Sequence, residues 1–311
     1  MIYLLMAILS SASIALVFKA LGSQGGNRYG VIIGNYLTCI VISLIMTGGP
    51  AAIVHAAPVT YLCGAVGGLL FVLGLVFMQS SVAANGATLT SAFGKLGVMV
   101  PLAFSFLIFR EQPAALQMVG IVIALAALVV INAPAKDAPA KAAANATDAP
   151  EASDAPAKDA PAPATTTSPK TYSFALLALT FLGNGLADSM AKVFEQVGPR
   201  SDDRVFISLV FIAAAVISAG LALREYRVTG APITKKELLS GVAVGVPNYF
   251  CSFFLLSSLT RLPSFLVYPI FSTGTIIAVM LVSTILFKER PTKKQLTGIA
   301  MILLALVLLN L

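Results

Sequence analysis

One short motif occurs twice in this chain, each time between two long apolar runs. The five residues 109–113, Phe-Arg-Glu-Gln-Pro, return 178 residues later at 287–291 as Phe-Lys-Glu-Arg-Pro. The register extends to three further pairs that match: Gln117 with Gln295, Gly120 with Gly298 and Asn132 with Asn310. A hydrophobic chain built from two copies of one unit usually encloses a site between the copies. The duplication therefore constrains both the fold and the place of a functional site.

The composition indicates a membrane protein. At 58% hydrophobic and 11% charged residues, the chain is too apolar for a soluble domain of 311 residues. Its apolar runs suit helices that cross about 30 Å of hydrocarbon, whereas a membrane β-barrel would show short alternating segments. We predict an all-α polytopic membrane protein. The ten predicted transmembrane helices span 2–21, 30–47, 60–80, 87–109, 115–132, 172–194, 204–222, 239–258, 264–287 and 293–311.

The two copies define two five-helix units, residues 1–132 and 171–311. Between them, residues 133–170 are almost entirely Ala, Pro, Asp, Lys and Thr, and they contain no aromatic or branched aliphatic side chain. Such a segment cannot bury enough apolar surface to fold. We predict that it is a disordered cytoplasmic linker.

The number of helices and the charges predict how the two units are oriented. Five helices per unit is an odd number, so the second unit must enter the membrane upside down relative to the first. Apart from Lys95, fourteen of the 19 basic residues lie in the loops after helices 1, 3, 5, 7 and 9. The positive-inside rule places these loops in the cytoplasm and both termini outside. The sequence thus predicts inverted repeats.

Common enzyme and metal motifs are missing from the sequence. His55 is the only histidine, and Cys39, Cys63 and Cys251 are scattered without metal-ligand spacing. No Walker-type loop and no nucleophile elbow occurs. We expect no enzyme activity, no cofactor and no metal site. The net charge of +7 is explained by the basic loops and requires no nucleic-acid partner.

The aromatic-basic-Glu motif between the fourth and fifth helix of each copy resembles the drug/metabolite transporter superfamily, with two EamA-type repeats. The Gln and Gly that follow it and Pro-Ile-Phe-Ser at 269–272 add to the resemblance. The resemblance implies a secondary transporter, an exporter or exchanger of a small polar metabolite, that works by alternating access around a central site. It also implies that helices 1 to 4 and 6 to 9 line this site, with helices 5 and 10 outside.

Two other functions stay open: a flippase for a lipid-linked carrier, built on the same fold, and a membrane receptor or scaffold that does not transport. An enzyme has the least support. The alanine-rich composition and the simple linker favour a bacterial inner membrane. The predicted partners are the lipid bilayer, a small anionic or zwitterionic solute, and protons if transport is coupled to them.

Lys95 is the most unusual residue of the predicted helices. It lies about two turns inside the fourth helix, where an ammonium costs several kcal/mol unless it is hydrated or paired. Thr88, Ser91 and Lys95 form one polar stripe at i, i+3 and i+7. In the second copy the counterpart is Thr273, within a Ser-Thr-Gly-Thr run at 272–275. We interpret Lys95 as a cavity cation that binds a carboxylate or phosphate; a structural ion pair or snorkelling is the alternative.

Asp188 is the predicted coupling residue. Asn184, Asp188 and Lys192 share one face of the sixth helix, and Asp188 with Lys192 has the i, i+4 spacing of a local ion pair. An intramembrane carboxylate is a frequent site of proton coupling because desolvation raises its pKa. The alternative is that this stretch lies in the headgroup zone.

Further polar residues complete the predicted site. Asn35, Asn248 and Tyr268 are cavity candidates, with simple bridging between helices as the alternative. The predicted substrate-binding residues are Lys95, Ser91, Asn35, Tyr268, Thr273 and Asn248.

Two paired features are interpreted as structural. Glu111 and Glu289 are expected to cap the helix that follows each of them, near its positive dipole end. The Gly-x-x-x-Gly motifs at 64–68 and 241–245 predict close helix contacts, which are also candidate sliding surfaces during alternating access.

Overall fold

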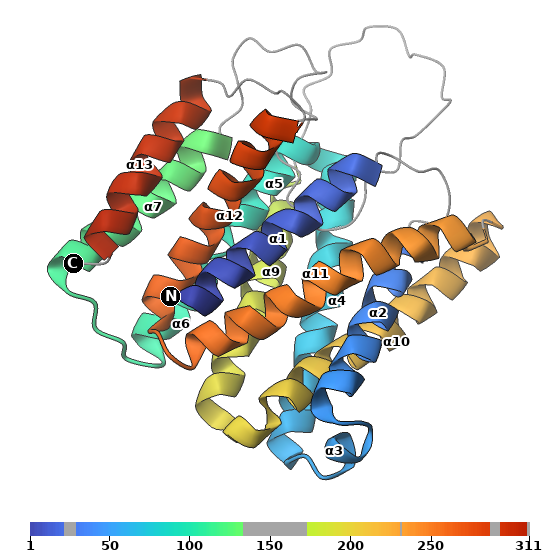
Figure 1. Ribbon diagram of the computed structural model, residues 1–311. Coiled ribbons are helices and arrows are strands. Elements are labelled where there is room, and N and C mark those ends of the chain that lie inside the picture. Colours follow the sequence, from blue (N-terminus) through green and yellow to red (C-terminus); the bar gives the residue numbers. More distant parts are fainter. Residues whose placement is uncertain (22–28, 133–172, 231, 287–292, 310–311) are drawn as a thin grey trace, which may run out of the picture.

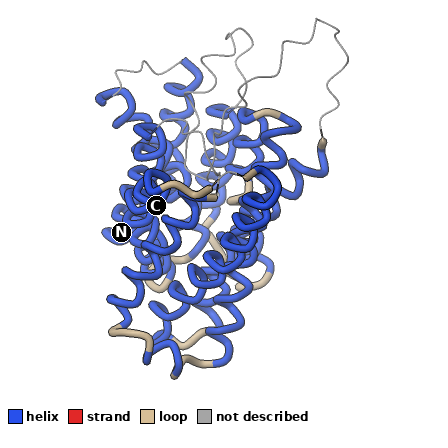
Figure 2. Tube along the Cα trace, turned by 90° about the vertical axis from the view of Figure 1, so that its right-hand side faces the viewer, coloured by secondary structure: helices blue, strands red, loops and turns tan. Residues whose placement is uncertain are grey.

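The structure, a computed structural model, describes residues 1–21, 29–132, 173–230, 232–286 and 293–309. Within these ranges it consists of helices and short connections, with no strand (Figures 1 and 2). Among the described residues, seven helices are long and apolar enough to cross a membrane. The predicted all-α polytopic membrane protein is therefore confirmed. The linker at 133–170 and the second motif copy at 287–291 lie outside the described residues.

The helices of the two halves follow one another in the order expected from the sequence. The first half contains α1 (Ile2–Leu21), α2 (Gly30–Thr47), α3 (Ala51–Val54), α4 (Pro58–Asn85), α5 (Ala87–Leu96), α6 (Met99–Leu107) and α7 (Ala115–Asn132). The second half contains α9 (Phe174–Val197), the 3₁₀ helix η1 (Arg200–Asp202), α10 (Asp203–Thr229), α11 (Lys235–Leu259), α12 (Ser264–Leu286) and α13 (Lys293–Leu309).

Some helices are long and apolar enough to span a membrane, and others are shorter. The seven candidate spans are Gly30–Thr47, Pro58–Asn85, Leu89–Leu107, Phe174–Val197, Arg200–Thr229, Lys235–Leu259 and Ser264–Ile285. Shorter apolar stretches of 10 to 17 residues occupy Ile2–Val17, Ala115–Ile131 and Gln295–Leu309. Ten spans, and the inverted orientation of the second half, stay predictions.

The fourth predicted helix, 87–109, is in fact two helices. It is interrupted after Leu96, and α6 begins at Met99. Pro101 has no N–H to donate to the carbonyl of Gly97, four residues earlier, and its ring crowds that carbonyl. The N–H of Val100 donates to Gly97 O instead, at 2.9 Å, in a tighter turn. The break therefore has a local cause, the proline.

Contacts between the helices are paired across the halves. In the first half α1 packs on α11 and α12, and in the second half α9 packs on α4, α5 and α6. Likewise α2 packs on α11 and α10 on α4, while α2 contacts α10 and α7 contacts α13 (Figure 1). Exchanging the halves turns each of these contacts into itself or into another contact of the same set. These paired contacts agree with the duplication that is visible in the sequence.

Glycines make the closest of these contacts possible. A Cβ added at Gly68 of α4 would lie 2.6 Å from the carbonyl oxygen of Val210 on α10. A Cβ added at Gly245 of α11 would lie 2.7 Å from the carbonyl oxygen of Asn35 on α2. Only a residue without a side chain allows backbones to approach this closely. The predicted role of both Gly-x-x-x-Gly motifs as helix contacts is confirmed.

Candidate functional site

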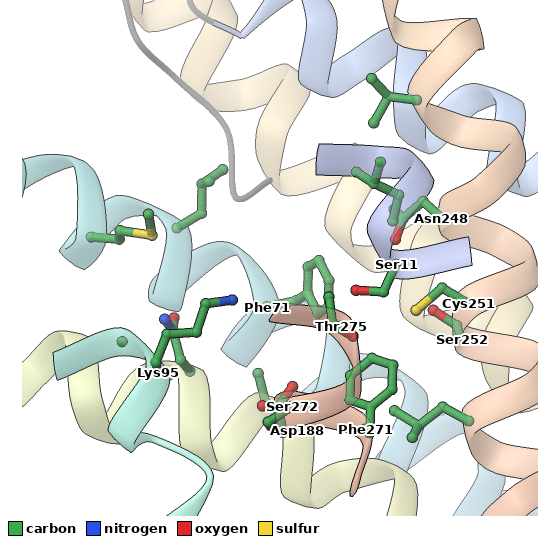
Figure 3. Close-up of a pocket in the computed structure, with 18 of the residues that line it drawn as sticks. Ser11, Phe71, Lys95, Asp188, Asn248, Cys251, Ser252, Phe271, Ser272 and Thr275 are labelled. Carbon is green, nitrogen blue, oxygen red and sulfur yellow. The ribbon is translucent and has the colours of Figure 1, made fainter. Parts of the chain in front are cut away.

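A cavity of about 230 Å³ lies between the two halves (Figure 3). Its lining comes from α1, α2, α4, α5, α9, α11 and α12, together with Val98 between α5 and α6. Among the described residues, α7, α10 and α13 contribute none. The expectation that the seventh helix, 204–222, lines the site is therefore wrong. That helix is α10, which packs on α4 through the glycine contacts and also packs on α2.

The predicted cation faces the cavity. Lys95 and Ser91 both line it from α5. Figure 3 shows the Lys95 side chain reaching into the open space, with Ser11 and Asn248 on the far side. A lysine that lines an internal cavity is not snorkelling to the membrane surface. Thr88, the third member of the predicted stripe, has a side chain outside the described part.

A carboxylate lines the same space. Asp188 and Asn184 of α9 are both lining residues, as is Ser272 of α12, and Figure 3 labels Asp188 and Ser272 at the cavity. Lys192, one turn further along α9, forms ion pairs of 3.1 Å with Glu111 and 2.8 Å with Glu195. The charge of Lys192 is therefore matched by carboxylates other than the predicted partner, Asp188.

An amide pair joins the two halves at the cavity wall. Asn248 Nδ2 on α11 donates to Asn35 Oδ1 on α2 at 3.1 Å, and both residues line the cavity. The thiol of Cys39 donates to Asn35 Oδ1 at 3.6 Å and to Gly245 O at 3.3 Å. The close approach at Gly245 brings these groups together. The two asparagines bridge the helices and also line the cavity, and their role in binding stays a prediction.

Tyr268 and Thr273 do not line the cavity, contrary to the sequence prediction. Tyr268 lies one turn before Ser272 on the same face of α12, and its hydroxyl donates to Asp188 O at 2.8 Å. Thr273 points along a different face of α12, and its hydroxyl donates to Pro269 O at 2.5 Å. Backbone hydrogen bonds thus occupy both hydroxyls. Tyr268 positions the turn that carries Asp188.

Several polar lining residues were missed from the sequence. Ser11, Cys251 and Ser252 all line the cavity. Ser252 follows Asn248 at the i, i+4 spacing of one helix face, so that spacing was a usable signal. Ser11 had no comparable signal, because it lies in the serine- and alanine-rich middle of α1.

Glu111 caps a helix, but not the one expected. Its carboxylate accepts hydrogen bonds from the N–H groups of Ser264 and Phe265, both at 3.2 Å, and from the Ser264 hydroxyl at 2.9 Å. These residues begin α12, in the other half of the chain, whereas α7 was predicted. Arg110 has a positive φ of 52°, and this bend precedes the carboxylate that reaches α12. Glu289, the second predicted cap, lies outside the described residues.

We call Glu111, Lys192, Glu195 and Ser264 the Glu111 cluster. The side chains of Lys192, Glu111 and Glu195 are 5%, 14% and 12% exposed. Burial raises the pKa of Glu111, but hydrogen bonds from Ser264 and the charge of Lys192 outweigh burial and leave this pKa below its ordinary value. The ring of Phe109 lies 5.6 Å from Lys192 Nζ, which gives the aromatic position of the motif a role.

A second cap crosses the halves at the same end of the molecule. Asp202, in η1 just after α9, accepts from Ala57 N at 2.9 Å and from the Thr60 hydroxyl at 2.8 Å. Ala57 precedes α4, in the first half. The first half therefore caps α12, and the second half caps α4.

Comparisons with known proteins agree with this architecture. The model of the EamA-like transporter family matches residues 169–311. A solved crystal structure aligns over 99% of this chain and 94% of its own, with a TM-score of 0.71 and 15% identity, and so shares the fold. No curated protein matches the sequence. The EamA match places residues 169–311 in the drug/metabolite transporter superfamily.

Proposed function

We propose that this membrane transporter moves a small zwitterionic or anionic metabolite by alternating access, as an exporter or exchanger. One observation carries the proposal: a single cavity, lined from both halves, contains the ammonium of Lys95 and the carboxylate of Asp188. A cavity lined by two halves is accessible to either side when the halves rock against each other.

The lining residues suit a solute that carries a carboxylate. The ammonium of Lys95 binds the solute's carboxylate or phosphate, and an intramembrane cation of this kind is usually functional. Asp188 then either binds the ammonium of a zwitterion or takes up a proton when the solute leaves. The hydrogen bond between the two amides uses a donor of Asn248 and the acceptor oxygen of Asn35. The amide nitrogen of Asn35 and the amide oxygen of Asn248 are left to bind the solute.

The size of the cavity favours a small metabolite over a lipid-linked carrier. Its volume of about 230 Å³ is below the roughly 300 to 1,000 Å³ of pockets for drug-sized ligands. A lipid-linked carrier requires a larger space with a lateral opening. The tests below distinguish the two alternatives: stabilisation by lipids alone would indicate a flippase, and binding without counterflow would indicate a receptor.

A binding screen followed by a transport assay tests the proposal. Purified protein is melted with zwitterionic amino acids, monocarboxylates, sugar phosphates and cationic amines, and solutes that stabilise it are assayed for counterflow in proteoliposomes. We expect Lys95→Ala to weaken binding about tenfold or more, and Lys235→Ala, at an exposed lysine, to leave it unchanged. Stabilisation by cations or lipids alone, or binding without counterflow, refutes the proposal.

Proton coupling is tested separately. We expect Asp188→Asn to abolish uptake driven by a pH gradient while counterflow of the same solute continues. The neutral amide keeps the shape of the side chain but cannot exchange a proton. If both activities survive in Asp188→Asn, Asp188 does not couple transport to protons.

A further inference from the structure

Many hydroxyl groups on the helices of this protein share one arrangement, although the Ser218 hydroxyl on α10 is buried without a partner. On α12, the hydroxyls of Thr273 and Thr284 donate to the carbonyl four residues earlier, at 2.5 Å and 2.8 Å. On α11, Ser257 and Ser258 do the same at 2.8 Å and 2.7 Å. This bond is the usual way in which a helix satisfies a hydroxyl that has no other partner.

Thr275 is an exception on the same helix. It is 4% exposed, and its hydroxyl oxygen has no hydrogen-bond partner within the described part of the chain. A buried hydroxyl without a partner is unfavourable and uncommon in folded proteins. Thr275 is also a lining residue of the cavity, unlike Thr273 two positions away. Thr275 therefore lines the proposed solute space, although its unpartnered hydroxyl oxygen is buried in this structure.

The surroundings of Thr275 are polar and lie across the cavity from Lys95. Ser11 of α1 and Ser252 of α11 line this side, and Ser272 precedes Thr275 on α12. Figure 3 shows Thr275 between Lys95, which enters from α5, and the wall formed by Ser11 and Ser252. A solute whose carboxylate is held by Lys95 thus extends toward hydroxyl groups and not toward a purely apolar wall.

We propose that Thr275 is a substrate-binding residue whose hydroxyl pairs with a hydrogen-bonding group at the solute's other end. The inference rests on the proposed function, since it takes Lys95 as the carboxylate site. Threonine in a helix has two accessible χ1 rotamers, so the hydroxyl turns toward a solute without movement of α12. The solute class is then a small carboxylate with a second polar group, such as a hydroxy acid or a hydroxylated amino acid.

Matched solutes and matched variants test the inference. The probes are pairs that differ by one hydroxyl: L-serine with L-alanine, L-threonine with L-2-aminobutyrate, and glycerate with lactate. Half-saturation in counterflow and the shift in melting temperature are measured for wild type, Thr275→Val, Thr275→Ser and Thr273→Val. Valine has the shape of threonine without the hydroxyl, serine restores the hydroxyl, and Thr273→Val is a control outside the cavity.

We expect wild type to prefer the hydroxylated member of at least one pair by about tenfold. Thr275→Val should reduce this preference to about one, whereas Thr275→Ser and Thr273→Val should keep it. Without solute, Thr275→Val should melt no lower than wild type, because the lost hydroxyl has no partner in the fold.

The remaining outcomes overturn the inference in distinguishable ways. An unchanged preference in Thr275→Val, or a wild type that binds both members of each pair equally, removes Thr275 from the site and leaves the proposed function standing. A lower melting temperature of solute-free Thr275→Val shows that the hydroxyl stabilises the fold. Failure of every pair to bind, while other solutes bind through Lys95, excludes the solute class. Failure of all solutes refutes the proposed function and this inference together.

Discussion

Replacement of Lys192 by methionine should destabilise the protein more than any other single change in the Glu111 cluster. Lys192 lies between two carboxylates, Glu111 at 3.1 Å and Glu195 at 2.8 Å, and its side chain is 5% exposed. Methionine fills a similar volume but leaves both carboxylates without their cation. Removal of one partner from a buried ion pair typically costs about 3 to 5 kcal/mol.

The expected loss is at the lower end of that range, about 3 kcal/mol, because Glu111 keeps its hydrogen bonds from Ser264 and Phe265. Glu111→Gln should cost less, about 1 to 2 kcal/mol, since Lys192 retains Glu195. The double variant should lose less than the sum of the two single losses, because the two residues share one interaction.

The composition of the protein suggests a suitable assay. The chain has no tryptophan and three cysteines, of which Cys39 and Cys63 are buried at 0% and 5% exposure. A dye that fluoresces on reaction with thiols therefore reports unfolding in detergent. We expect the melting temperature of Lys192→Met to lie about 5 to 10 °C below that of the wild type. The control Lys235→Met, at an exposed position, should have the melting temperature of the wild type. Equal melting of Lys192→Met and wild type would refute the reasoning.

Three further predictions concern stability. The pKa of Glu111 lies below its ordinary 4.5 in the folded protein, so its stabilisation is present above this value and is lost as pH falls through the folded pKa. The difference in melting temperature between wild type and Glu111→Gln should therefore be constant near neutral pH, and it should shrink as the pH falls below 4.5 and through the folded pKa of Glu111. Gly68→Ala should lower the melting temperature, because its Cβ meets Val210 O at 2.6 Å, whereas Gly220→Ala, with nothing within 4 Å, should not. Asp202→Ala should cost about 1 kcal/mol through loss of the α4 cap, measured with the same dye.

Much of the fold could be predicted from the sequence because hydrophobic length is a strong local signal. The bounds predicted for α1, α2 and α7 agree with those observed, at 2–21, 30–47 and 115–132. The break between α5 and α6 was not predicted, although Pro101 is visible in the sequence. Pro247 and Pro269 lie inside continuous helices, so a proline alone does not locate a break.

The site was only partly predictable because the sequence shows which residues share a face but not what that face meets. Lys95, Ser91, Asn35, Asn248 and Asp188 were expected at the cavity and line it. Their roles in binding and coupling stay predictions. The partner of Glu111 could not be predicted, because Ser264 is 153 residues away in the chain.

The crossed caps have a consequence for synthesis of the protein. Ala57 leaves the ribosome 145 residues before Asp202, so α4 enters the membrane before its capping carboxylate exists. Glu111 is likewise synthesised 153 residues before Ser264, so its hydrogen bonds to α12 form only after α12 has been made. A nascent chain that stops after its first half thus presents an uncapped helix end and an unpaired acid together. Insertion of the second half supplies both partners, so a chain truncated after its first half lacks hydrogen bonds at two helix ends that the complete chain forms.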